Sequence, residues 1–484
     1  MSQFLPQTPS KNIKLGIGID YGTSNSAAAI FDGKRIQLVK LEPDSEIMPS
    51  ATHVDKDFRI VTGQEAIEYY IEGNVGRTVE LSAEVLGEHR TGTGQIGDRG
   101  LPEEASTEKV YGQSFIDSGQ KGRLFRGIKR LLGSSTGTRL VVFDRPFRLV
   151  ALITPLLTRI KRAVVASAYQ NFNIENSLKH ACIGHPVNFE GKSEARNTIA
   201  LDLLSEAYNY AEFSQQTYYP EPIAAAISYL FHHPRATEQT MLAVDFGGGT
   251  LDLCILRKKS NDFSVLATHG IGLGGDHIDQ AMFRRLIFPL LGKGERWRRS
   301  GEDRSIETSF PFEEYEELLL NWTISYILNQ NKYTTPLMQR IEYDDIASVK
   351  FRRLYDLIKN NYSYLVFQYL KDIKALLSSN ESARLDIPEL DIDIIVTKND
   401  FESYISELLV AFHSAVLELL SKANINPNEI ELVIRTGGSS LIPAFKNILE
   451  DLFPAKVIEH DPFTSVAAGL AIADFKDLGN LRTN

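Results

Sequence analysis

The fold of this chain is decided by the stretch Ala243-Val244-Asp245-Phe246-Gly247-Gly248-Gly249-Thr250-Leu251-Asp252. The apolar run from Met241 to Val244 predicts a buried strand that ends at a carboxylate and is followed by three glycines. Because glycine has no Cβ, this backbone can turn tightly and bring its N–H groups, together with the Thr250 hydroxyl, close to a bound anion. Asp245 and Asp252 lie beside the turn, where they are placed to hold a hydrated Mg²⁺. Taken alone, the stretch is explained equally well as a glycine-rich hairpin between two core strands.

A second stretch repeats this design near the N-terminus, in Ile17-Gly18-Ile19-Asp20-Tyr21-Gly22-Thr23-Ser24-Asn25-Ser26. Asp20-Tyr21-Gly22 aligns with Asp245-Phe246-Gly247, and the polar residues Thr23, Ser24 and Asn25 follow the turn. Two related hairpins in the two halves of one chain predict two similar lobes that face each other across a phosphate. Such an arrangement holds a nucleotide in a cleft.

The paired loops resemble those of the actin, sugar-kinase and heat-shock-chaperone ATPase superfamily. Their sequence is similar to the ATPase domain of the heat-shock protein 70 (DnaK-type) chaperones, from about Ile13 to Ala473, and is closest to the short bacterial members that lack the usual peptide-binding domain. The resemblance implies an α/β chain with a two-lobed actin-like ATPase fold, in which each lobe has a ribonuclease H-like mixed sheet flanked by helices. The expected parts are a flexible tail at 1–12, lobe I at 13–237 plus 459–484, and lobe II at 238–458 with an enlarged helical insert at about 281–365.

Composition narrows the classes of function. The chain has 484 residues and a net charge of −10, which argues against a general nucleic-acid or anionic-membrane surface. Its two cysteines, Cys182 and Cys254, both lie in apolar strand-like segments and fit a reducing compartment better than a disulfide framework. No apolar leader and no apolar run long enough to span a bilayer is evident, so we expect a cytoplasmic protein.

Two further motifs supply candidate catalytic groups. The basic segment Leu124 to Gly133 resembles the family motif that carries the catalytic lysine, which by that match is Lys129. An ammonium beside the γ-phosphate stabilises transition-state charge and helps orient the attacking water. The alternative is the end of an amphipathic helix with a solvated basic face. Glu221 matches the family's Glu-Pro-x-Ala-Ala-Ala motif and would position water, although a carboxylate at a helix start is also explained by the helix dipole.

Three glycine- or lysine-containing motifs complete the expected nucleotide site. Gly274 and Gly275 open a predicted helix, whose free N–H groups would bind phosphate. Lys374 and Ser378 lie one turn apart on a helix that resembles the family's adenosine-binding helix. The second adenosine motif contributes Gly437, Gly438 and Ser439. The chain departs from the family pattern at Lys371, Leu441 and Phe463, which leaves its nucleotide affinity open.

The segments between these motifs predict ordinary surface structure. The sequence predicts a helix over residues 61–85, a loop or irregular hairpin from Leu86 to Ser118, and one helix from Lys398 to Ala423. The 281–365 insert is interpreted as an enlarged surface subdomain, with a partner-binding insert as the alternative.

The resemblance implies a slow, Mg²⁺-dependent ATPase. Asp20 and Asp245 would hold Mg²⁺ through waters, while Thr23, Thr250 and the loop N–H groups would bind the phosphates of ATP or ADP. Lys129 would place and activate water with Glu221 and Asp252. Lobe closure on ATP and opening after hydrolysis would be the output.

The expected biological role is that of a chaperone or chaperone-like nucleotide switch. The chain stops at Asn484, eleven residues beyond Ala473, which leads us to expect no peptide-binding domain. Three alternatives stay open: an actin-like filament-forming scaffold, a small-molecule kinase, and a nucleotide-sensing module with negligible hydrolysis. We expect a monomer that binds nucleotide and has an unidentified protein partner or client, with no nucleic-acid or membrane partner.

Overall fold

The structure is a computed structural model that describes residues 14–77, 79, 81–91, 106–117, 119–133, 139–143, 145–174, 178–186, 189, 194–233, 238–260, 262–298, 307–461 and 463–478. The chain divides into two compact units. The first comprises Met1–Tyr70, Arg123–Ile287 and Phe367–Asn484, and the second comprises Ile71–Gly122 and Phe288–Val366. The predicted tail at 1–12 lies outside the described residues. Both predicted lobes have their sheets in the first unit, and the lobe boundaries stay predictions.

Among the described residues, the first sheet has six strands: five follow the order β13-β12-β1-β2-β3, and β4 (Met48–Pro49) pairs with β2 beside this path. Three strands consecutive in sequence form an antiparallel meander, and two later strands extend it in parallel from β1. The strands are β1 (Gly16–Tyr21), β2 (Asn25–Phe31), β3 (Ile36–Leu38), β12 (His180–His185) and β13 (Gln215–Pro220). The predicted first glycine turn therefore joins β1 to β2, at the edge where β12 and β13 also end.

The second sheet has the same topology, in the order β16-β15-β14-β21-β22. Again a meander of three antiparallel strands is extended by two parallel strands, here from β14. The strands are β14 (Glu238–Phe246), β15 (Leu251–Lys259), β16 (Asp262–Ile271), β21 (Leu432–Thr436) and β22 (Val457–Glu459). This duplicated order confirms the predicted ribonuclease H-like sheet in each half.

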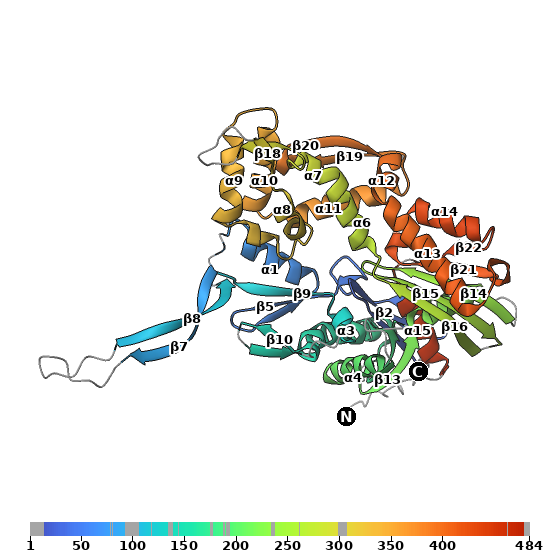
Figure 1. Cartoon of the computed structure of the whole chain (residues 1–484). Coiled ribbons are helices and arrows are strands. Elements are labelled where there is room, and N and C mark those ends of the chain that lie inside the picture. Colours follow the sequence, from blue (N-terminus) through green and yellow to red (C-terminus); the bar gives the residue numbers. More distant parts are fainter. Residues whose placement is uncertain are drawn as a thin grey trace, which may run out of the picture. The chain divides into compact units, whose positions relative to one another are not determined.

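Helices cover both faces of each sheet, as Figure 1 shows. Two helices, α5 (Glu221–His232) and α15 (Ser465–Phe475), pack against each other; α15 covers β1, β2 and β12, while α5 also contacts β14 and β15. The opposite face of the first sheet shares a core with α3 (Leu149–Phe172) and α4 (Glu194–Tyr210). On the second sheet, α13 (Ser406–Ala423) contacts β15 and β16, and α14 (Pro443–Leu452) contacts β22.

The alternation of side chains along β2 produces these two separate cores. Ala28 and Ile30 belong to the cluster shared with α3 and α4, whereas Ala27, Ala29 and Phe31 belong to the cluster shared with α5 and α15. Successive residues of a strand point to opposite faces, so a strand buried on both sides is apolar throughout.

Glycine allows the closest packing in the middle layer. A Cβ at Gly469 of α15 would overlap the carbonyl oxygen of Ala224 in α5, and a Cβ at Gly18 of β1 would overlap the carbonyl oxygen of Ala467 in α15. The helix α15 can therefore approach both its neighbours only because these positions carry no side chain.

The first unit also contains a set of smaller elements. They are β5 (Ala51–Asp55), β6 (Ile60–Thr62), α1 (Gln64–Asn74), β9 (Gly122–Arg126), α2 (Ile128–Leu131), β10 (Arg139–Val142), β11 (Arg145–Arg148), α6 (Gly275–Met282), α11 (Ser363–Leu377), β19 (Ser382–Ile387), β20 (Ile392–Thr397) and α12 (Lys398–Tyr404). Of these, α1, β9 and α11 cross the boundary between the two units.

The structure corrects the prediction of one helix from Lys398 to Ala423. Helix α12 ends at Tyr404 and α13 begins at Ser406, with a bend of 65° between them. No proline or glycine marks this break in the sequence. No single helix among the described residues is long and apolar enough to cross a membrane; α12 and α13 meet that criterion only as a bent pair, by length and composition alone.

The second unit contains a long hairpin and a mostly helical insert. Strands β7 (Leu81–Thr91) and β8 (Ser106–Asp117) pair in antiparallel fashion with two irregularities in register. This confirms an irregular hairpin, but its first strand begins at Leu81, inside the segment that the sequence predicted to be helical. The predicted helix over 61–85 is too long, because α1 ends at Asn74. The insert holds α7 (Phe288–Leu290), β17 (Arg296–Arg298), β18 (Glu307–Ser309), α8 (Glu313–Leu319), α9 (Asn331–Ile341) and α10 (Ser348–Lys359).

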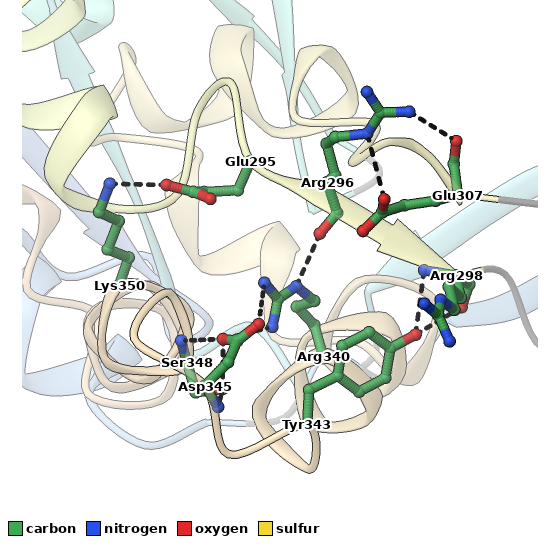
Figure 2. A network of polar contacts seen from close by, with 9 residues as sticks. All are labelled: Glu295, Arg296, Arg298, Glu307, Arg340, Tyr343, Asp345, Ser348 and Lys350. Carbon is green, nitrogen blue, oxygen red and sulfur yellow. Dashed lines mark hydrogen bonds and ion pairs between the residues drawn. The ribbon is translucent and has the colours of Figure 1, made fainter.

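A buried arginine ties the insert together (Figure 2). Arg340 of α9 is 3% exposed, donates to the carbonyl of Arg296 in β17 at 2.8 Å, and forms two bonds of 3.0 Å to Asp345. Tyr343 donates to the carbonyl of Arg298 at 2.7 Å, and its ring also lies beside the Arg340 guanidinium. The β17–β18 hairpin, which the sequence did not predict, is therefore fastened to α9 and to the turn that leads into α10.

Candidate functional site

A cavity of about 500 Å³ opens in the first unit, at the edge where the glycine turns of both sheets lie. This volume is within the usual range for small-molecule sites. Every predicted site residue except Gly274 lines it: Asp20, Gly22, Thr23, Ser24, Asn25, Lys129, Glu221, Asp245, Gly247, Gly248, Gly249, Thr250, Asp252, Gly275, Lys374, Ser378, Gly437, Gly438 and Ser439. The structure thus brings together residues separated by more than 400 positions in the sequence.

Carboxylates from three elements face one another in this cavity. Asp20 lies near the end of β1, Asp245 near the end of β14, and Glu221 at the first residue of α5. Burial, and then repulsion from Glu221, raises the pKa of Asp20 to about 7. Burial also raises the pKa of Asp245 well above its usual value, with further contributions from Glu221, Asp252 and Asp20. A cation bound among these carboxylates would stabilise their ionised forms and so lower the pKa values of both Asp20 and Asp245.

Lys129 is the buried cation of this group. It belongs to α2, a helix of four residues that follows Gly127, whose φ of 66° lies in the left-handed region. Its Nζ donates to Glu221 Oε1 at 2.5 Å, and the two residues are 5% and 9% exposed. Burial acts to lower the pKa of Lys129, but Glu221, Asp20 and Asp252 outweigh it and raise the pKa. The alternative of a solvated basic face is therefore wrong for Lys129.

The glycine turns touch each other across the cavity. A Cβ at Gly248 would lie 2.9 Å from the Cβ of Ser24, which real side chains do not tolerate. Beside the turn, the Thr250 hydroxyl donates to Asp252 at 2.8 Å, and Asp252 lies directly opposite Asp245 in the β14–β15 pair. The glycines of both turns therefore line the cavity with backbone, beside the side chains of Thr23, Ser24 and Thr250.

The start of α6 does not offer the free N–H groups that the sequence predicted. The N–H of Gly275 donates to the carbonyl of Gly247 at 3.1 Å, and the N–H of Asp276 donates to Gly248 at 2.7 Å. The next two N–H groups of the helix donate to the carbonyl of Gly274. That expectation is wrong, because the helix start braces the glycine turn instead. Gly274 packs directly against the backbone of the glycine turn, because a Cβ at this position would lie 2.5 Å from the carbonyl group of Gly248.

Helix α11 forms the opposite wall. Lys374 Nζ lies 2.5 Å from Asp279 Oδ1, and Asp279 of α6 is 1% exposed. Ser378 donates to the carbonyl of Lys374 at 2.9 Å, and Ser439 donates to that of Gly247 at 3.1 Å. The pair of Lys374 and Asp279 thus joins α11 to α6, which itself braces the glycine turn.

Sequence reasoning missed four charged residues of this cavity, one of which is Asp276 of α6. Arg126 and Arg130 line it from the segment that also carries Lys129, and Asp279 lines it from α6. The two arginines could have been found from the spacing of basic residues around Lys129, and Asp279 from its position one turn after Asp276. The departures Lys371, Leu441 and Phe463 all line the cavity as well.

The residues present fit a hydrated magnesium ion and a nucleotide. Among the described residues, no group of three His, Cys, Asp or Glu side chains is arranged to ligate a metal directly. The buried side chains are carboxylates with raised pKa values, and oxygen ligands with retained waters are what Mg²⁺ prefers. Backbone exposed at the glycine turns suits phosphate oxygens.

Comparison with known proteins agrees with this geometry. The family model described as Hsp70 protein matches residues 146–290 and 351–474, more than half of the chain. The chain belongs to the Hsp70 family. It therefore has the two-lobed actin-like ATPase fold, which the two sheets of identical strand order already display.

Similar Hsp70 proteins include two curated relatives. The chaperone protein HscA homolog of Histophilus somni (strain 129Pt) is 24% identical over 464 residues, and that of Aromatoleum aromaticum (strain DSM 19018 / LMG 30748 / EbN1) is 23% identical over 464 residues. In each case the alignment covers 95% of this chain and 57% of the relative. The chain thus spans a little over half the length of these Hsp70 relatives.

Proposed function

We propose that this Hsp70 chain is a magnesium-dependent ATPase that acts as a chaperone-type nucleotide switch. The observation that carries the proposal is the meeting of Asp20, Asp245 and Glu221 with Lys129 in one cavity, beside two glycine turns from two sheets of the same topology. The names of the relatives support the chaperone role, and the family supports the use of ATP and ADP.

Asp20 and Asp245 would hold Mg²⁺ through water molecules. When bound, the ion supplies positive charge to the phosphate oxygens and offsets the buried carboxylates. Gly22, Thr23 and Ser24 of one turn and Gly247 to Thr250 of the other would receive the phosphate chain. The adenosine would extend toward Lys374, Ser378 and the turn of Gly437 to Ser439.

Lys129 and Glu221 would act on the attacking water. Glu221 accepts from Lys129, so the carboxylate is held in place at the first turn of α5. A carboxylate oriented in this way can accept a hydrogen bond from water while the ammonium stabilises charge that develops on the γ-phosphate. Asp252, which accepts from Thr250, would orient the water from the other turn.

Calorimetric titration of the purified chain tests the first step of this proposal. We expect Mg·ATP and Mg·ADP to bind with a stoichiometry of one, and binding to weaken when EDTA removes the metal. Single-turnover hydrolysis then separates an ATPase from a nucleotide sensor, which would bind ATP without cleaving it. No binding of either nucleotide would contradict the proposal.

Two further measurements address the other functions. A small-molecule kinase would consume ATP only after an acceptor is added, and a filament-forming scaffold would pellet on centrifugation with ATP. Monomeric state, a cytoplasmic location and the lack of nucleic-acid or membrane partners are likewise proposals, which size-exclusion chromatography and fractionation of cells can test.

A further inference from the structure

Positive charge gathers on the wall of the cavity that α11 forms. Lys371 and Lys374 line the cavity from this helix, and Arg126 lines it from the segment before α2. Lys371, Lys374 and Ser378 are spaced three and four residues apart, so they lie on one face of α11. The carboxylates on this side are Asp276 and Asp279.

Lys371 has no partner of its own on this wall. Lys371 forms no hydrogen bond and no ion pair with another described residue. Lys374, in contrast, forms an ion pair with Asp279, with 2.5 Å between Nζ and Oδ1. Burial lowers the pKa of Lys371; Asp279 and Asp276 raise it, while Arg126 and Lys374 lower it further. A desolvated ammonium beside two other cations is unfavourable unless an anion joins it. A buried ammonium that two carboxylates offset only in part, and that lines a cavity, is typical of a ligand site.

This cationic wall is a second charge centre, distinct from the carboxylate group. The groups that act on Asp245 are Glu221, Asp252, Asp20 and Lys129. The main charged groups that act on Lys371 are Asp279, Arg126, Asp276 and Lys374. Lys374 Nζ lies 3.4 Å from the carbonyl of Gly275, which braces the glycine turn, whereas Lys371 lies one helical turn before Lys374 and forms no bond to the described residues of the turn. A ligand whose 5′-phosphates lie at the glycine turns beside the carboxylates therefore needs another anionic group to meet Lys371.

We propose that the wall of Lys371, Lys374 and Arg126 binds a phosphate on the ribose of the nucleotide, separate from its 5′-phosphate chain. The proposal rests on the proposed nucleotide-binding function of the same cavity. In an adenine nucleotide the 2′- and 3′-hydroxyl groups are the positions that can carry such a phosphate. Lysine and arginine side chains form strong charge-assisted bonds to phosphate oxygens. The ligand class is thus the 2′- or 3′-phosphorylated adenine nucleotides.

Calorimetry with matched ligands tests this inference on the full chain. ADP is compared, in the presence of Mg²⁺, with the two ADP derivatives that carry one additional phosphate at the 2′ or the 3′ position. We expect one derivative to bind about tenfold more tightly than ADP, because a charge-assisted bond to a phosphate contributes on that scale. The preference should fall as salt rises. The isomer that gains affinity identifies the ribose position.

Variants of Lys371 show whether this side chain is responsible. Lys371→Met should abolish the preference while ADP affinity changes less than about threefold, and Lys371→Arg should retain it. Lys34→Met, at an exposed lysine outside the cavity lining, is the matched control and should behave as the wild type. Circular dichroism confirms that each variant folds.

Three outcomes would overturn the inference. If ADP binds and neither derivative binds more tightly, the ribose phosphate site does not exist, while the nucleotide-binding function stands. If Lys371→Met weakens ADP and its derivatives equally, Lys371 contacts the 5′-phosphate chain instead. If no adenine nucleotide binds, both this inference and the proposed function fail.

Discussion

Replacing Lys129 by methionine removes a buried ammonium while keeping most of the side-chain volume. In the wild type, Lys129 Nζ lies 2.5 Å from Glu221 Oε1, and both residues are almost fully buried. Asp20 and Asp245 interact with the same pair. Lys129→Met therefore leaves Glu221 buried beside other carboxylates, without the cation that offsets them.

The expected loss of stability follows from burial and from proton uptake. Removal of one partner from a buried ion pair typically lowers the free energy of unfolding by about 3–5 kcal/mol. Lys129 acts to lower the pKa of Asp20, which burial and Glu221 raise to about 7. Removal of Lys129 raises that pKa further, so Asp20 in the variant keeps a proton that the unfolded chain releases above its usual pKa of about 3.9. The native state then binds more protons than the unfolded state, so stability falls as pH rises, by up to about 1.4 kcal/mol per pH unit for one proton. We expect a loss of about 3 kcal/mol at pH 7.

Urea unfolding followed by far-UV circular dichroism at pH 6, 7 and 8 measures this effect. Glu221→Gln and the double variant Lys129→Met/Glu221→Gln complete a double-mutant cycle, and the double variant should recover about 2 kcal/mol relative to Lys129→Met. Under the proposed function, each of these variants should also lose ATP turnover by at least about 100-fold, the scale of removing one transition-state-stabilising group.

Two results would refute this reasoning. If Lys129→Met is as stable as the wild type at all three pH values, the pair is not buried among carboxylates. If the loss does not grow with pH, the removal of Lys129 leaves the pKa of Asp20 unchanged and the electrostatic account of the site is wrong.

The remaining predictions concern other parts of the chain. Asp245→Asn should stabilise the nucleotide-free protein by about 1–2 kcal/mol, because it removes a buried carboxyl group whose raised pKa shows that its ionised form is unfavourable there. The same variant should abolish the dependence of ADP affinity on Mg²⁺; thermal unfolding and calorimetry measure the two effects. Gly469→Ala should destabilise the protein by at least about 3 kcal/mol through collision with the Ala224 carbonyl, whereas Gly272→Ala, where a Cβ meets nothing within 4 Å, should change stability by less than about 0.5 kcal/mol in urea unfolding. Arg340→Met should lower the stability of the second unit by about 2–4 kcal/mol, because the Arg296 carbonyl loses its buried donor; both tryptophans of the chain lie in that unit, so their fluorescence reports its unfolding, and an unchanged midpoint would contradict the role of Arg340.

Much of the fold could be predicted because its signals are local. An apolar strand, an aspartate and a glycine turn recur around Asp20 and Asp245, and each predicts a hairpin without reference to the rest of the chain. The break at Ile405 between α12 and α13 could not be predicted, because the apolar pattern continues through it and no proline or glycine marks it. The β17–β18 hairpin was missed for a different reason. Each of its two strands has only three residues, which is too short for a pattern of alternating side chains to be recognised.

The candidate site divides in the same way. The residue types at Gly248, Thr250 and Lys374 could be selected from motifs, and the structure brings them to one cavity. The first N–H groups of α6 donate hydrogen bonds to carbonyl groups of the glycine turn. The sequence could not predict these bonds, because they depend on how closely the helix start approaches the turn.

By itself, the sequence determined two glycine turns, each headed by an aspartate, and the apolar strands that lead into them, since backbone conformation and strand burial follow from neighbouring residues. Only the tertiary structure decided that Lys129 meets Glu221, that Lys374 pairs with Asp279, and that Lys371 lies near Asp279 and Asp276 without forming an ion pair of its own with any described residue. The physical reason is that the energy of a charge depends on its distance from other charges and from water. Those distances are set by strands and helices far apart in the chain.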